Sequence, residues 1–232
     1  MITLRDRMSR GRTNTGWLDS RHSFSFGSYH DPKQMGFRSL RVINEDRVIP
    51  GAGFPAHSHR DMEILSYVLE GGLRHKDSLG NGSAIAPGEV QRMSAGTGIT
   101  HSEYNASADQ AVHFLQIWVI PSERGTPPGY EQKMLGQEGK RGILELAAGP
   151  RGSGAPVSIQ QDARMHVARL DAGTQVSYDL APGRGAWLQI ARGAAALNGA
   201  EMKEGDGAAI EGEACFAITG ISAAEVLLFD LA

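Results

Sequence analysis

The sequence predicts an all-β protein built from short strands. Its 232 residues include 30 glycines and 10 prolines, a content typical of a chain with many tight turns. Few stretches repeat their apolar residues at the spacing of a helix, whereas several short segments alternate or run apolar as strands do. The length suffices for one large domain or two small ones.

The N-terminal half carries the clearest strand signals. Residues 22–30 alternate between aromatic and polar side chains, as a half-buried strand would. Residues 37–43 predict another strand, with Leu40 and Val42 on one face. The remaining predicted strands and turns follow in order: strands at 63–69, 73–77 and 113–120, and turns at 70–72, 78–82 and 87–88.

A stretch of different composition follows residue 120. Residues 121–156 are rich in proline and glycine and predict an inter-domain connection, after which strand-like segments and glycine turns resume. The order of strand, Asn-Gly hairpin and glycine turn near 69–88 returns near 191–207, which indicates an internal duplication. We therefore expect an N-terminal domain at 1–125, a connecting segment at 126–156 and a C-terminal domain at 157–232.

Charge and cysteine content exclude several classes of protein. The net charge is −3 and no basic stripe is present, so direct binding of nucleic acid is not expected. No apolar run follows the arginines of the first twelve residues, which argues against a secretory signal or a membrane span. Cys215 is the only cysteine, so internal disulfides and cysteine-based zinc sites are excluded and a cytoplasmic location is expected. Its apolar neighbours predict a buried side chain.

Two pairs of residues have the spacing of metal ligands on strands. His57 and His59 form the first pair, and His101 and Glu103 form the second. On an extended strand, residues i and i+2 point the same way and lie roughly 6.6 Å apart. Two such pairs on neighbouring strands can converge on one ion, and three imidazoles with one carboxylate suit a divalent transition metal.

The carboxylate of the site has two candidates. Glu63 would lie roughly 13 Å from His59 on a straight strand, too far for ligands of one ion. A turn at residues 60–61 would bring Glu63 back, so this argument leaves it open. Glu103 shares the face of His101 by simple alternation and is the favoured ligand.

The spacing of these residues resembles the two motifs of the cupin β-barrel. Gly51, the His57/His59 pair and Glu63 match the first motif, and residues 88–105 match the second, with a serine at position 94 in place of the usual proline. More specific segments resemble the pirin family; they are residues 16–20, 22–26, 35–37, 40–44, 57–64, 93–99, 101–105, 116–118 and 130–132. The match is dense in the N-terminal half and loose in the C-terminal half.

The pirin resemblance implies a fold and a site. The family is a bicupin, with two antiparallel, jelly-roll-like β-barrel domains and one metal held in the N-terminal barrel by the residues matching His57, His59, His101 and Glu103. The C-terminal domain would lack metal ligands, because His166 is the only histidine after residue 113. Iron(II) is the expected metal, and manganese, nickel, copper and zinc also fit the ligand set.

The resemblance is strongest to bacterial pirin-like proteins with quercetin 2,3-dioxygenase activity. It implies an enzyme that cleaves quercetin-like flavonols with O2 and releases carbon monoxide. Glu103 would serve both as a ligand and as the acceptor of the substrate proton. The alternative is a metal-containing regulator of the pirin type that binds a transcription factor or a metabolic enzyme. An open cavity of aromatic size above the metal would favour the enzyme.

Other notable residues have structural interpretations. His22 and His113 are expected to be hydrogen-bonded structural histidines, with His113 also a candidate neighbour of the metal ligands. Trp118 is expected in the core of a barrel. Phe54 is close enough in sequence to the histidines to line a pocket.

Overall fold

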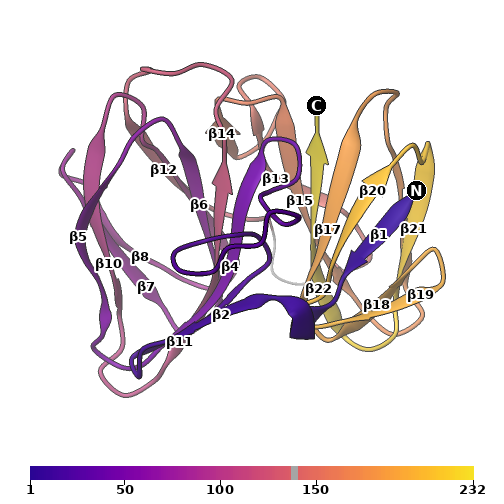
Figure 1. Ribbon diagram of the computed structural model, residues 1–232, viewed down its shortest axis with the longest axis horizontal. Helices are drawn as coiled ribbons and strands as arrows, with labels where there is room; N and C mark the ends of the chain where they lie inside the picture. The colour runs from indigo at the N-terminus through magenta and orange to yellow at the C-terminus, as the bar shows by residue number, and fades with distance from the viewer. Residues whose placement is uncertain (137–140) are drawn as a thin grey trace.

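The computed structural model describes residues 1–136 and 141–232 of the chain. Apart from one turn of 3-10 helix, η1 (Arg7–Ser9), the regular elements of these residues are strands, so the predicted all-β class is confirmed. Within these two ranges, no helix has the length and the apolar character needed to cross a membrane. The strands form two halves that lie side by side (Figure 1).

The N-terminal half consists of a seven-stranded and a four-stranded sheet. Its strands are β2 (Gly11–Asn14), β3 (Leu18–His22), β4 (Leu40–Val48), β5 (Gly53–His59), β6 (Glu63–Glu70), β7 (Leu73–Asp77), β8 (Gly82–Ile85), β9 (Glu89–Ser94), β10 (Ile99–Asn105), β11 (Val112–Val119) and β12 (Gly129–Met134). The larger sheet has the order β12-β9-β6-β11-β4-β3-β2, and the smaller one has the order β5-β10-β7-β8.

The C-terminal half repeats this plan. Its strands are β1 (Ile2–Arg5), β13 (Glu145–Pro150), β14 (Val157–Ile159), β15 (Ala163–Leu170), β16 (Gln175–Asp179), β17 (Gly185–Arg192), β18 (Ala194–Leu197), β19 (Ala200–Lys203), β20 (Gly207–Glu211), β21 (Cys215–Gly220) and β22 (Ala224–Leu231). The sheets have the orders β1-β20-β17-β22-β15-β13-β14 and β16-β21-β18-β19. Every pairing is antiparallel except β13 with β14, and in the described residues the sheets stay open instead of closing into a barrel.

One strand crosses between the halves. The first strand, β1, pairs with β20 in the C-terminal sheet, so the start of the chain belongs structurally to the second half. The segment predicted as a connection, 126–156, contains β12, which pairs with β9, and β13, which pairs with β15. The division into domains at 1–125, 126–156 and 157–232 stays a prediction.

The main apolar core lies between the two seven-stranded sheets. Alternation along β6 directs Leu65, Tyr67 and Leu69 to this core, together with apolar residues of β15, β17 and β22 from the other half. These central strands are buried on both faces and are therefore mostly apolar, although Ser66 interrupts β6 and Gln116 interrupts β11. The molecule is therefore a stack of four sheets, with the four-stranded sheets outermost (Figure 1).

The structure confirms the strands predicted at 63–69, 73–77 and 113–120, which are β6, β7 and β11, and the hairpin turn between β7 and β8. The strand predicted at 22–30 is wrong beyond its first residue, because β3 ends at His22 and the following segment leaves the sheet. The strand predicted at 37–43 begins at Leu40 and continues to Val48. The predicted burial of Cys215 is also wrong: its side chain is exposed, because the alternation of β21 buries Phe216 and Ile218 instead.

Candidate metal centre

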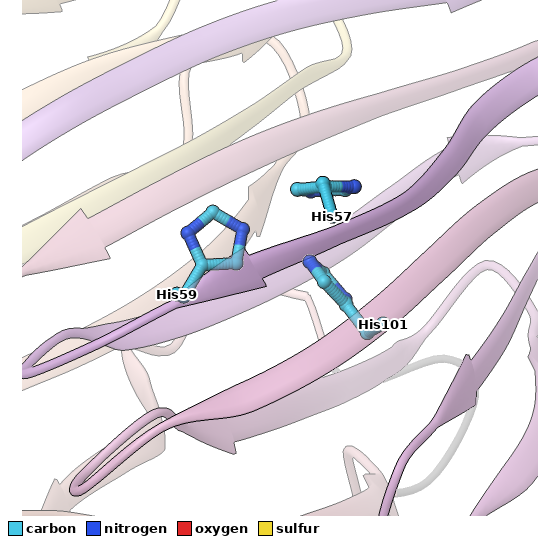
Figure 2. A group of neighbouring side chains, drawn as sticks. All are labelled: His57, His59 and His101. Carbon is cyan, nitrogen blue, oxygen red and sulfur yellow. The ribbon is translucent and has the colours of Figure 1, made fainter.

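Strands β5 and β10 bring the two predicted ligand pairs together. They are antiparallel neighbours, and His57 lies directly opposite His101. The ring centroids of His57 and His101 are 4.4 Å apart, and His59 lies 4.8 and 4.9 Å from them. Figure 2 shows the three rings gathered over one face of the two strands. Their ligand nitrogens all lie within 4.8 Å of one another, close to the roughly 4.2 Å maximum for two ligands at about 2.1 Å from one ion.

A bulge in β5 orients the first histidine. The register between β5 and β10 shifts by one residue between His101 and Glu103, where the edge strand contains Pro55. The Pro55 carbonyl lies 2.8 Å from Nδ1 of His57. Because a carbonyl oxygen can only accept, Nδ1 carries the proton and Nε2 is left to bind a metal.

The other two histidines are held in the neutral form that binds metals. Burial, followed by the nearby charge of His57, lowers the pKa of His59 to about 4. Burial and the neighbouring histidines lower the pKa of His101 to about 3. Both ring nitrogens of His101 are buried and find no hydrogen-bond partner within the described part of the chain. A metal ion would supply the missing interaction for one of them, so the donor set fits a metal.

Glu103 lies beside His101 on the same face of β10. Its carboxylate accepts hydrogen bonds from Ser66 Oγ at 3.2 Å and from Gln116 Nε2 at 2.7 Å, both on the facing seven-stranded sheet. Burial raises the pKa of Glu103 to about 7 despite these hydrogen bonds. The carboxylate lies within 4.8 Å of ligand atoms of His101 and His75, but it is not part of the group formed by His57, His59 and His101. A cation at the histidines would favour its ionised form.

Glu63, the second candidate carboxylate, lies elsewhere. It accepts a hydrogen bond from Ser94 Oγ at 2.8 Å and one from the backbone N–H of Gln160 at 3.3 Å. On β6 it has the opposite parity to Ser66, so it faces the C-terminal half while Ser66 faces Glu103. The structure therefore places Glu103, and not Glu63, next to the histidines.

A row of polar side chains crosses the inner face of the seven-stranded sheet. Successive members lie directly opposite one another on adjacent strands, and the row consists of His22, Asn44, Gln116, Ser66 and Gln91. Neither Gln116 nor Ser66 was predicted as a site residue, although both donate hydrogen bonds to Glu103. Alternation places each of them on the inner face, but the register between strands that aligns them is not readable from the sequence.

His75 was also missed. It is buried on β7 opposite Glu103, its Nε2 lies 3.1 Å from Asp77 Oδ2, and its ring centroid lies 5.3 Å from that of His101. The signal in the sequence is its alternation with Leu73 and Asp77, which share its buried face.

A cavity of about 210 Å³ opens beside the histidines. Aromatic side chains form part of its lining: Phe26, Phe54 and Trp118. The prediction that Phe54 lines a pocket is thus confirmed. Trp118, predicted in a barrel core, packs against a buried apolar cluster but is itself only half-buried, and its ring stands edge-on to His59 with centroids 5.0 Å apart.

The two histidines expected to be structural are hydrogen-bonded as predicted. His22 lies 2.8 Å from both Thr13 Oγ1 and Asn44 Oδ1, and it also lines the cavity. His113 lies 3.1 Å from Glu45 Oε1 on the other face of the sheet, so it does not contact the metal ligands.

These features define a class of protein, a bicupin with one candidate metal site. Within residues 1–136 and 141–232, the clusters of histidine and acid side chains able to hold a metal all lie in the N-terminal half. Residues 4–119 match the family model for pirin, and residues 146–231 match the model for the quercetinase C-terminal cupin domain. The chain belongs to the pirin family.

Relatives match along the whole chain. Quercetin 2,3-dioxygenase of Escherichia coli is 45% identical over all of this chain and 99% of its own length. A pirin-like protein of Caulobacter vibrioides is 40% identical over 96% of both chains. The crystal structure of a bacterial pirin from Escherichia coli in complex with nickel(II) superposes with a TM-score of 0.93 at 45% identity, over 100% of this chain and 99% of that one.

Proposed function

We propose that this protein is a metal-dependent dioxygenase that cleaves quercetin-like flavonols with O2. The observation that carries the proposal is the cavity, which joins His57, His59 and Glu103 to aromatic walls suited to a flat ring system. Relatives named quercetin 2,3-dioxygenase that align over the full chain support it.

We propose that His57, His59, His101 and Glu103 hold one divalent metal, and that the metal is iron(II). The ligand set also accepts nickel, which the related Escherichia coli pirin binds, as well as manganese, copper and zinc. A metal bound by four protein ligands keeps open positions, where it would act as a Lewis acid and lower the pKa of the flavonol 3-hydroxyl.

The protein's own residues would position the substrate and move its proton. Glu103 would accept the proton of the 3-hydroxyl, because its carboxylate lies at the cavity beside the histidines. Gln116 and Ser66 hold that carboxylate from behind and fix its direction. Phe54 and Trp118 would pack on the flavonol rings and exclude water from them.

The cavity sets a limit on how a flavonol can bind. Its volume of about 210 Å³ lies below the roughly 300 Å³ at which small-molecule sites usually begin. The exposed residues Gly27 and Ser28 lie at its margin, so part of the substrate would extend past them toward solvent.

The test combines metal analysis with oxygen uptake. Natively expressed protein, and protein reconstituted with iron(II), are supplied with quercetin while O2 consumption and carbon monoxide release are measured. We expect uptake that Glu103→Ala and His57→Ala abolish. Glu63→Gln is the matched control, because Glu63 is a buried carboxylate that faces away from the cavity. Its metal content and uptake should equal those of the parent.

Bound metal without oxygen uptake would refute the dioxygenase. The pirin-type regulator would then be the better account, with a protein partner to be sought. We also propose a cytoplasmic location, because the chain has a single cysteine, and fractionation of cells that express the native protein tests it.

A further inference from the structure

The wall of the cavity formed by β3 and β4 is polar. Ser20, Asn44 and Asp46 line it, and all three lie in the same cavity as His57, His59 and Glu103. Ser20 lies directly opposite Asp46 on the paired strands, and His22 lies opposite Asn44. This wall belongs to the seven-stranded sheet, whereas the histidine ligands belong to the facing sheet.

Most of this wall is hydrogen-bonded internally. The Asn44 oxygen can only accept, so Nδ1 of His22 donates to it, and Nε2 of the neutral ring accepts from the Thr13 hydroxyl. Burial lowers the pKa of His22, which keeps the ring neutral. Thr13, His22 and Asn44 therefore form a continuous chain of hydrogen bonds, in which both ring nitrogens of His22 have a partner.

Asp46 is the exception. Its side chain is 3% exposed, yet its Oδ1 finds no hydrogen-bond partner in the parts of the chain that the structure describes. No Lys, Arg or His forms an ion pair with it among the described residues, although Glu45 and Arg47 on either side of it both do on the outer face of β4. A buried acceptor without a donor opposes folding. Its place in the cavity wall points to a ligand that supplies the donor.

The remaining lining limits what that ligand can be. Phe26, Phe54 and Trp118 favour a flat aromatic body, and the histidines with Glu103 occupy the facing sheet. A donor that reaches Asp46 from such a body is a phenolic hydroxyl. We propose that Asp46 accepts a hydrogen bond from a ring hydroxyl other than the one at the metal, and so selects polyhydroxylated flavonols. This proposal rests on the proposed function and specifies its substrate class.

The test compares two probes that differ only in their remote hydroxyls. Quercetin carries ring hydroxyls besides the 3-hydroxyl, whereas 3-hydroxyflavone carries none. Binding of each to the metal-loaded protein is measured without O2 by the shift in flavonol absorbance. We expect Asp46→Ala to weaken quercetin binding by about threefold to tenfold, the effect of losing one hydrogen bond. The affinity for 3-hydroxyflavone should stay within about twofold of the parent, since no bond to Asp46 is lost.

Two further variants separate recognition from structure. Asp46→Asn keeps an acceptor oxygen at the same place and should recover part of the quercetin affinity. Asp19→Asn is the matched control on β3: Asp19 lies on the outer face, where it pairs with Arg12, so both affinities should be unchanged. Metal content and melting temperature, measured for every variant, show whether it is folded.

The outcomes separate the two proposals. If Asp46→Ala lowers both affinities equally, or neither, while the folded parent binds both probes, the role of Asp46 is refuted and the dioxygenase stands. If the parent binds quercetin but consumes no O2, the dioxygenase is refuted, and the ratio of the two affinities still decides the role of Asp46. A parent that binds neither probe refutes both.

Discussion

The carboxylate of Glu103 is held by neutral donors alone. Gln116 and Ser66 bind it from the facing sheet, and its side chain is 2% exposed. Neutral hydrogen bonds offset only part of the cost of burying a charge, which is why its pKa is raised to about 7. The position of this group therefore depends on two side chains that do not themselves reach the metal.

We expect Gln116→Leu to weaken metal binding by about 10- to 100-fold, because the carboxylate loses its shorter hydrogen bond. Competition with a chromogenic chelator measures the affinity. Gln91→Leu is the matched control: Gln91 lies in the same polar row and is also buried, but it makes no hydrogen bond to Glu103. Equal loss in both variants would mean that the row acts through the packing of the sheet and not through Glu103.

The lowered pKa of Glu45 makes the stability of the fold depend on pH. Burial alone would raise its pKa, but the hydrogen bond with His113 and the charge of Arg10 outweigh burial and lower it from 4.5 to about 2. A carboxyl with a depressed pKa stabilises the fold above pH 4.5, and this contribution is lost as the pH falls toward 2. We expect Glu45→Gln to cost on the order of 3 kcal/mol at pH 7 and much less near pH 2. Urea unfolding across this range measures the difference.

The control for this comparison is Asp19→Asn, which alters an exposed ion pair and should change stability by less than about 1 kcal/mol at either pH. A penalty for Glu45→Gln that is constant from pH 7 to pH 2 would contradict the assignment, because it would show that the charge of Glu45 does not contribute.

At the scale of the elements, the ligand set depends on how closely β5 approaches β10. Gly53 begins β5, and a Cβ there would lie 2.3 Å from the carbonyl oxygen of Glu103 and 2.5 Å from Cα of Tyr104. Only glycine permits this approach, because backbone atoms cannot move aside as a flexible side chain can. The bulge at Pro55 then adjusts the register, so that His57 and His101 face each other.

We expect Gly53→Ala to destabilise the protein by about 1–3 kcal/mol and to weaken metal binding, since it would push the edge strand off its neighbour. Thermal unfolding and chelator competition measure the two effects. Gly82→Ala is the matched control in the same sheet, because its nearest neighbour would be 3.9 Å away. If both variants melt alike, the close approach at Gly53 does not control the site.

These elements show how far the sequence predicts the site. The i, i+2 spacing of His57/His59 and His101/Glu103 predicted three histidines that the structure brings together, with Glu103 beside His101 on the same face, because alternation is a property of the backbone. The register between strands is set by bulges and distant pairings, so Gln116, Ser66 and His75 were not found. The alternation of residues 23–30 was also misleading, because contacts between distant parts of the chain, and not a strand, produce it.

In that segment, Phe24 and Phe26 both need burial, but in different places. Phe24 packs on Trp187 between the two halves with ring centroids 4.7 Å apart, whereas Phe26 packs on Trp118 at the cavity with centroids 5.3 Å apart. The alternation of apolar and polar residues in this segment thus comes from a loop whose two phenylalanines pack in different apolar regions, and not from a strand. Tertiary contacts of this kind leave no separate signal in a single sequence.

At the scale of the whole molecule, the two halves share their largest core. Phe229 on β22 belongs to the apolar cluster that also contains Leu65 and Leu115 of the metal-binding half. We expect Phe229→Ala to cost about 3–5 kcal/mol and to lower the temperature of metal release together with the melting temperature. Calorimetry and metal release, followed on the same sample, test this. Ile221→Ala is the control, because its side chain is 45% exposed.

Two separate transitions, with metal release unaffected by Phe229→Ala, would contradict a shared core. They would instead favour two domains that fold independently, as the proline- and glycine-rich stretch in the sequence suggested.

The exposed thiol of Cys215 allows the distance between the two halves to be measured by spectroscopy. It lies on β21 in one outer sheet, whereas the three histidines lie on β5 and β10 in the other (Figure 1). Packed sheets are about 10 Å apart, so the stack of four separates the two points by about 30 Å. Because no other cysteine competes, one nitroxide label would attach at a defined point. Its dipolar coupling to a paramagnetic ion would then report whether the halves keep their spacing as substrate enters.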